Sequence, residues 1–117
     1  MWEFLRGKKG GRRDRASRVR VESPIHFRKA GDFAWNVGKM KNISRSGVLF
    51  RAGQMIAVNT PLEMQFNAPA EIGPVPGELI VARGKIVRTL MPAASHQYPA
   101  FAAKFSGFSV VRQSNNW

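Results

Sequence analysis

The fold is decided by residues 33–50, which read FAWNVGKMKNISRSGVLF. Apolar and polar side chains alternate from Phe33 towards Ile43, which is the period of a half-buried β-strand. Ser46 and Gly47 interrupt the alternation, and three apolar residues then resume it. The segment therefore predicts two strands that are joined by a short polar turn.

The same alternation continues on both sides of this segment. It predicts further strands at residues 19–28, 62–66, 79–90 and 98–105. Turn-forming residues at 29–32 join the first of these to the strand that begins at Phe33, as a hairpin, and Gly84 marks a bulge or bend in its strand. No helical apolar period is sustained over the roughly 11 residues of a packed helix. The sequence predicts an all-β fold, a small antiparallel β-barrel of five or six strands.

The chain divides into three parts. We expect a flexible basic N-terminal arm at residues 1–11, a barrel domain at residues 12–111 and a C-terminal tail at residues 112–117. The last apolar residues are expected to close the open end of the barrel as a short helix or an extended tail; they are Phe108, Val110 and Val111.

Charge favours an anionic partner. The 117 residues include 19 Lys and Arg against 7 Asp and Glu, which gives a net charge of +12. Half of this net charge lies in the first 20 residues. The basic residues of this segment are Arg6, Lys8, Lys9, Arg12, Arg13, Arg15, Arg18 and Arg20. Such a balance suits nucleic acid, a nucleotide or an anionic lipid surface.

Catalysis and metal binding find little support in the composition. The chain has no cysteine and only two histidines, His26 and His96, so zinc, iron–sulfur and thiol chemistry are not expected, nor is a cofactor. The acidic residues are scattered singly, so no carboxylate pair is placed for acid–base work. No apolar run approaches the roughly 20 residues that span a bilayer. We therefore expect a cytoplasmic protein that is not an enzyme.

Two segments stand out as candidate binding elements. Residues 12–18 form an arginine cluster just before the first strand, and residues 42–47 form a polar turn at the end of its hairpin partner. The two ends of an antiparallel hairpin meet at one sheet edge, so these segments should be neighbours. Arginine binds phosphate and the guanine edge through its planar fork, and Gly47 would permit a positive φ and a close approach of a ligand to the backbone. The same Asn-x-Ser-x-x-Gly spacing also suits an Asx turn with a glycine bulge that only connects two strands.

Together these segments resemble the PilZ domain family, which are bacterial receptors for cyclic dimeric GMP. The resemblance covers about residues 12–108 and implies a six-stranded antiparallel barrel. In that family an RxxxR motif wraps the phosphates and guanines of the ligand, and a [D/N]xSxxG motif on the barrel contacts a guanine. Asn42, Ser44 and Gly47 match the second motif at every defined position.

The first motif is matched less closely. Arg18 fits its second arginine, but Asp14 occupies the position four residues earlier, between Arg13 and Arg15. Because the cost of closing a flexible loop depends weakly on its length, Arg13 can serve as the first arginine with one residue of slack. The resemblance therefore implies a ligand site with these residues: Arg12, Arg13, Arg15, Arg18, Asn42, Ser44 and Gly47.

The resulting hypothesis is a non-catalytic cyclic dimeric GMP receptor whose arm becomes ordered across the barrel and presents a new surface to a downstream protein. One alternative is a degenerate family member that binds only proteins, with terminal residues such as Trp2 and Trp117 docking on a partner. A second alternative is a basic nucleic-acid-binding barrel. It is disfavoured because it needs exposed aromatic side chains, whereas the aromatic residues fall in registers typical of a core. Those residues are Phe33, Trp35, Phe101 and Phe105.

Overall fold

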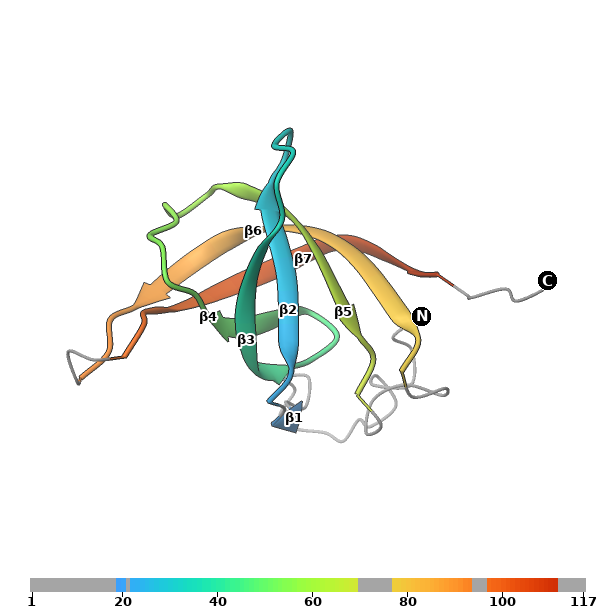
Figure 1. Ribbon diagram of the computed structural model, residues 1–117, viewed down its shortest axis with the longest axis horizontal. Helices are drawn as coiled ribbons and strands as arrows, with labels where there is room; N and C mark the ends of the chain where they lie inside the picture. The colour runs from blue at the N-terminus through green and yellow to red at the C-terminus, as the bar shows by residue number, and fades with distance from the viewer. Residues whose placement is uncertain (1–18, 21, 70–76, 94–96, 112–117) are drawn as a thin grey trace.

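The computed structural model describes residues 19–20, 22–69, 77–93 and 97–111, all of whose regular structure is β-strand. The strands are β1 (Val19–Arg20), β2 (Pro24–Lys29), β3 (Asn36–Ile43), β4 (Gly47–Arg51), β5 (Pro61–Asn67), β6 (Leu79–Leu90) and β7 (Ala100–Val111). Figure 1 shows the long β6 and β7 crossing behind the β2–β3 hairpin.

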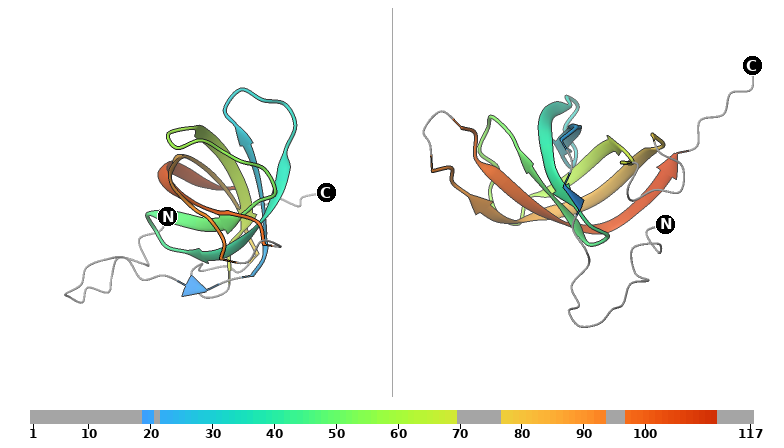
Figure 2. Two further views of the ribbon diagram at one scale, coloured as in Figure 1. Left: turned by 90° about the vertical axis from the view of Figure 1, so that its left-hand side faces the viewer. Right: turned by 90° about the horizontal axis from the view of Figure 1, so that it is seen from below.

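The strands close into a six-stranded antiparallel barrel. Their order is β3-β2-β5-β6-β7-β4, and pairing of β4 with β3 closes the ring. The two-residue β1 pairs with the far end of β3. Figure 2 shows the strands wrapping around a common interior. The predicted all-β barrel and the hairpin of β2 with β3 are confirmed, but β1 and β2 are two separate strands where a single strand at residues 19–28 was expected.

Alternating side chains fill the barrel. In β5 the inward residues are Leu62, Met64 and Phe66, while their neighbours are at least partly exposed. The rings of Phe27, Phe50 and Phe101 form a row at the centre, with centroids 5.1 and 5.9 Å apart. Such tilted aromatic pairs add to the stabilisation from burial alone. The core therefore joins four strands that are far apart in sequence: β2, β4, β5 and β7.

The prediction that Phe33 and Trp35 lie in the core is wrong. Phe33 is 90% exposed, in the loop between β2 and β3, and the half-buried Trp35 ring lies 4.2 Å from the Arg28 guanidinium. Both residues precede β3, and within β3 a bulge at Lys41 shifts the β3–β4 register by one residue. A one-residue shift exchanges the two faces of a strand. Ile43 is consequently buried, whereas the earlier odd-numbered residues of the alternation face outward.

A glycine at an inward position of β3 also contributes to the wrong prediction of which residues face the core. Before the bulge, the inward positions of β3 are Gly38 and the buried Met40, and a Cβ at Gly38 would lie 2.6 Å from the Arg51 backbone oxygen and 3.2 Å from the Phe50 ring. Gly38 therefore leaves room for the central aromatic row. An inward position without a side chain gives no hydrophobic signal in the sequence.

The C-terminal segment also differs from the prediction. Phe108, Val110 and Val111 belong to β7 and pair with β6, where a short helix or a tail was expected. A bulge at Ser106, opposite Gly84, again changes which residues face inward, so Phe105 and Phe108 both pack against the core. The register does shift between Arg83 and Gly84, where a bulge was expected, but the extra residue lies in β7 and not in the strand of Gly84.

Candidate functional site

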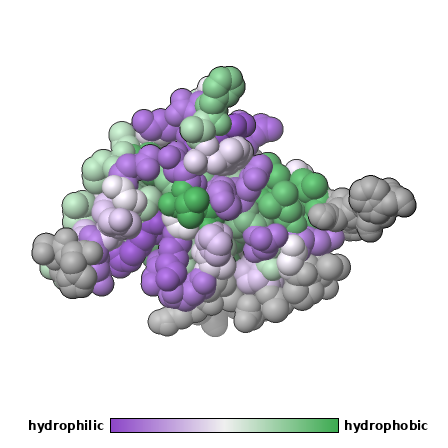
Figure 3. Space-filling view, viewed as in Figure 1, coloured by the Kyte–Doolittle hydropathy of each residue, from purple (hydrophilic) through white to green (hydrophobic). Residues whose placement is uncertain are grey.

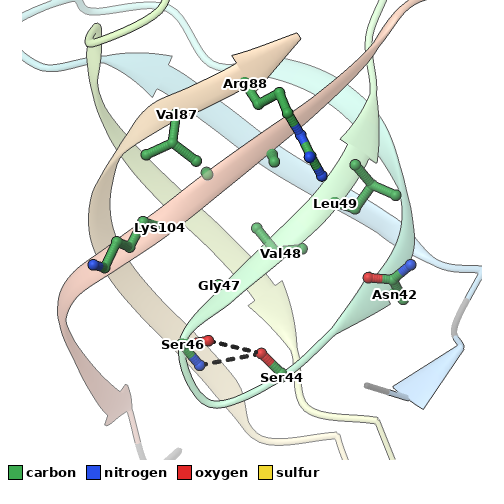
Figure 4. Close-up of a pocket in the computed structure, with 11 residues that line it drawn as sticks. Asn42, Ser44, Ser46, Gly47, Val48, Leu49, Val87, Arg88 and Lys104 are labelled. Atoms are coloured by element: carbon green, nitrogen blue, oxygen red, sulfur yellow. Dashed lines mark hydrogen bonds between the residues drawn. The ribbon is translucent and has the colours of Figure 1, made fainter. Parts of the chain in front are cut away.

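A tight turn connects β3 to β4, and Ser44 organises it. The Ser44 backbone N–H donates to the Gly47 carbonyl at 2.9 Å, and the Ser44 Oγ accepts from the Ser46 backbone N–H at 3.2 Å. The two serine hydroxyls also lie 3.2 Å apart (Figure 4). Ser44 is 7% exposed and is the buried polar side chain of the described residues. Much of its hydrogen-bonding capacity is therefore used within the turn.

Gly47 serves the packing of two strands. It is paired with Lys104, and a Cβ at Gly47 would collide with the backbone oxygen of Ala103. The positive-φ glycines of the described residues are Gly31 and Gly77. The expectation of a positive φ at Gly47 is thus wrong, and the close approach is made by the backbone of β7.

Asn42 is the motif residue whose side chain is most available. It follows the bulge at Lys41, lies opposite Leu49 on β4 and is only partly buried. Its amide has no hydrogen bond to another side chain or backbone group among the described residues. An amide offers both donors and an acceptor, which is what the edge of a base requires.

These three residues border a pocket of about 260 Å³ on the outer wall of the barrel (Figure 4). It is lined by Asn42, Ser44, Ser46, Gly47, Val48, Leu49, Val87, Arg88, Ala102, Ala103 and Lys104. Among the described residues, its charged lining residues are Arg88 and Lys104, and no acidic residue of that part of the chain lines it. It is smaller than the roughly 300–1,000 Å³ of sites that enclose a drug-sized ligand. By itself the pocket has room for part of a dinucleotide.

The predicted arginines Arg12, Arg13, Arg15 and Arg18 lie outside the described residues. The chain that follows them is described: in β1, Val19 is paired with Ile43 and Arg20 with Asn42. The short strand that follows the arginine cluster in the sequence is therefore paired with Asn42, which lines the pocket. This pairing places β1 at the same sheet edge as Asn42 and Ile43.

Sequence reasoning missed Val87, Arg88 and Lys104. Their place in the pocket depends on the pairing of β7 with both β4 and β6, which no local motif reveals. One weak signal exists: Ile86 and Val87 are adjacent apolar residues that break the alternation, and a bulge is one cause of such a break. The β6–β7 register indeed shifts between Ile86 and Arg88.

Two lysines of β3 share one carboxylate. Lys41 donates a hydrogen bond to Glu22 at 3.0 Å, and Lys39 lies 3.5 Å from the same carboxylate. The hydrogen bond from Lys41, together with its charge, lowers the pKa of the Glu22 carboxyl. Glu22 is fully exposed, so water and salt screen this interaction strongly.

The described part of the chain holds no cluster of three or more His, Cys, Asp or Glu side chains suited to a metal ion. His26 is exposed on β2, and His96 lies outside the described residues. The described part also has no helix long and apolar enough to cross a bilayer.

Fold and pocket together define a small antiparallel β-barrel domain with a basic, partly apolar hollow on its outer wall. The sequence model of the PilZ domain matches residues 12–113. The chain therefore belongs to the PilZ domain family, whose members generally bind cyclic dimeric GMP and are typically non-catalytic receptors. Searches of the curated proteins and of the solved structures found no significant match.

Proposed function

We propose that this protein is a non-catalytic receptor for cyclic dimeric GMP. The observation that carries the proposal is the pairing of Arg20 with Asn42, because it joins the end of the arginine cluster to the edge of the motif pocket. Arg18 precedes β1 by a single residue, so its backbone is within about 4 Å of a residue paired with Ile43. An arginine side chain from this segment is long enough to extend over the pocket.

In this proposal the role of each site residue follows from the chemistry of its side chain. Arg13 and Arg18 clamp phosphates and the guanine Hoogsteen edges, with Arg12 or Arg15 in support, since a guanidinium donates two parallel hydrogen bonds to such groups. Asn42 hydrogen-bonds to a guanine. The remaining residues of the barrel motif act as follows: Ser44 holds the turn closed and offers its remaining capacity to the ligand, and Gly47 allows β4 and β7 to approach.

The size of the pocket supports a site that is completed by another segment. A hollow of about 260 Å³ leaves much of a cyclic dinucleotide outside the barrel wall. The arginine segment would cover that part and become ordered on binding. Ordering of a segment by a ligand is a common way to create a surface for a downstream protein. We further propose that the protein acts in the bacterial cytoplasm through a protein effector.

Nucleic-acid binding and protein binding alone are the two alternative functions that a binding experiment must distinguish from the proposed one. The structure removes one argument against a nucleic-acid-binding barrel, because Phe33 is exposed. The loop that contains Phe33 projects at the top of Figures 1 and 3, away from β1 and the β3–β4 turn at the lower side. A binding module for proteins alone is the other alternative.

Titration calorimetry on the full chain separates the three functions. We expect the protein to bind cyclic dimeric GMP, and we expect GTP and single-stranded DNA to displace this ligand poorly. Arg18→Ala and Asn42→Ala should each weaken the binding at least about tenfold. The affinity should fall only slightly with salt, since the ligand has two phosphates. A nucleic-acid binder would show tighter binding to the DNA and a steep salt dependence. Absence of any nucleotide binding would favour the protein-binding module.

A further inference from the structure

Two cations of the pocket come from the barrel itself. Arg88 on β6 and Lys104 on β7 are both exposed, and neither forms an ion pair with a carboxylate of the described residues. Glu22 pairs with Lys39 and Lys41, and Glu63 pairs with Arg28, so these two carboxylates are engaged by other cations. Arg88 and Lys104 therefore present unneutralised positive charge to whatever occupies the pocket.

A bulge directs Arg88 to the outer wall. Ile86 is fully buried and opposite Ala103, so in a regular strand Arg88, two residues later, would also face the core. Val87 is the extra residue, and after it Arg88 is paired with Ala102 on the outer face. Bulges commonly redirect a side chain in this way next to functional sites. Without the bulge, a guanidinium would be directed into an apolar core.

The strand registers place Arg88 in one cross-strand row with the motif. Arg88 is paired with Ala102, Ala102 with Leu49, and Leu49 with Asn42. With strands about 4.8 Å apart, Arg88 and Asn42 begin roughly 14 Å from each other at the Cα atoms. The small Ala102 lies between them, and Figure 4 shows the Arg88 side chain extending from β6 across β7 towards Leu49. Asn42 and Arg88 thus bracket an apolar floor.

We propose that Arg88 binds a phosphate of the cyclic dinucleotide, with Lys104 adding a second positive charge, while a guanine rests on the floor between Arg88 and Asn42. This inference rests on the proposed function and assigns it a residue outside both sequence motifs. The planar fork of Arg88 suits bidentate contact with a phosphate, and Lys104 acts as a point charge. The wall guanidinium offsets the Asp14 that occupies an arginine position of the first motif.

The test compares two arginines of the same strand. Arg83 and Arg88 are both exposed on β6, but Arg83 does not line the pocket. By calorimetry with cyclic dimeric GMP, Arg88→Ala should weaken binding about tenfold or more, whereas Arg83→Ala should stay within about twofold of wild type. Arg88→Lys should recover only part of the loss, because it keeps the charge and removes the fork.

Two different results would overturn the inference, and they show whether the proposed function fails with it. If the wild-type protein binds the dinucleotide and Arg88→Ala binds equally well, Arg88 has no role and the proposed function stands. If the wild-type protein does not bind it, both fail. A thermal melt of Arg88→Ala serves as the folding control; since Arg88 is exposed and unpaired with any described carboxylate, its Tm should match that of Arg83→Ala.

Discussion

The backbone oxygen of Ala103 on β7 occupies the space that a side chain at Gly47 on β4 would need. Gly47→Ala should therefore force the two strands apart and destabilise the fold by about 1–3 kcal/mol, the usual range for overpacking. Urea denaturation measures this loss. The matched control is Gly107→Ala, since a Cβ at Gly107 meets no atom within 4 Å. Equal stability of the Gly47 variant and wild type, with loss of ligand binding alone, would assign Gly47 to the ligand.

Removal of the Ser44 hydroxyl should loosen the β3–β4 turn. Ser44→Ala deletes the acceptor of the Ser46 backbone N–H and should lower the free energy of unfolding by about 1 kcal/mol. Ser46→Ala is the control, because it removes only the contact between the two hydroxyls. Urea denaturation should rank the Ser46 variant closer to wild type. The opposite ranking would contradict the role assigned to Ser44.

The carboxyl of Glu22 should titrate below its ordinary range. Its pKa is lowered chiefly by the hydrogen bond and charge of Lys41, so Lys41→Ala should raise that pKa towards the ordinary value. The sign of the linkage follows: the pair stabilises the fold above the unfolded-state pKa of Glu22, and this contribution is lost as the pH falls through the lowered folded-state pKa. Carboxyl-detected NMR titration measures the shift. An unchanged pKa in Lys41→Ala would contradict this cause.

Restoring the RxxxR spacing should strengthen ligand binding. Asp14→Arg places a guanidinium four residues before Arg18 and removes a negative charge next to Arg13, so the affinity for cyclic dimeric GMP should rise about tenfold. Asp14→Ala separates the two effects, because it removes the charge without adding the fork, and its gain should be smaller. Calorimetry that shows no gain in either variant would mean that this position does not contact the ligand.

Much of the barrel could be predicted from alternation alone, and the failures coincide with bulges. The bulge at Lys41 exchanged the faces of β3, so that Val37 is exposed while Ile43 is buried, and the bulge at Ser106 did the same in the last part of β7. A bulge adds one residue to a strand and leaves little trace in composition. A period-two pattern therefore cannot reveal which residues face the core beyond the bulge.

The candidate site likewise contains some residues that the sequence could predict and others that it could not. Asn42, Ser44 and Gly47 could be found because their spacing is local, within one turn. Arg88 and Lys104 reach the pocket only through the pairing of β7 with β4 and β6. Such long-range register is set by the closure of the whole barrel.

The central claim is tested most directly by one calorimetric titration of the full chain with cyclic dimeric GMP at physiological salt. The account predicts saturable binding with a Kd in the micromolar range or tighter, which corresponds to about −8 kcal/mol or more favourable. Absence of binding heat at about 100 µM ligand, confirmed at a second temperature to exclude a zero enthalpy, would contradict the account.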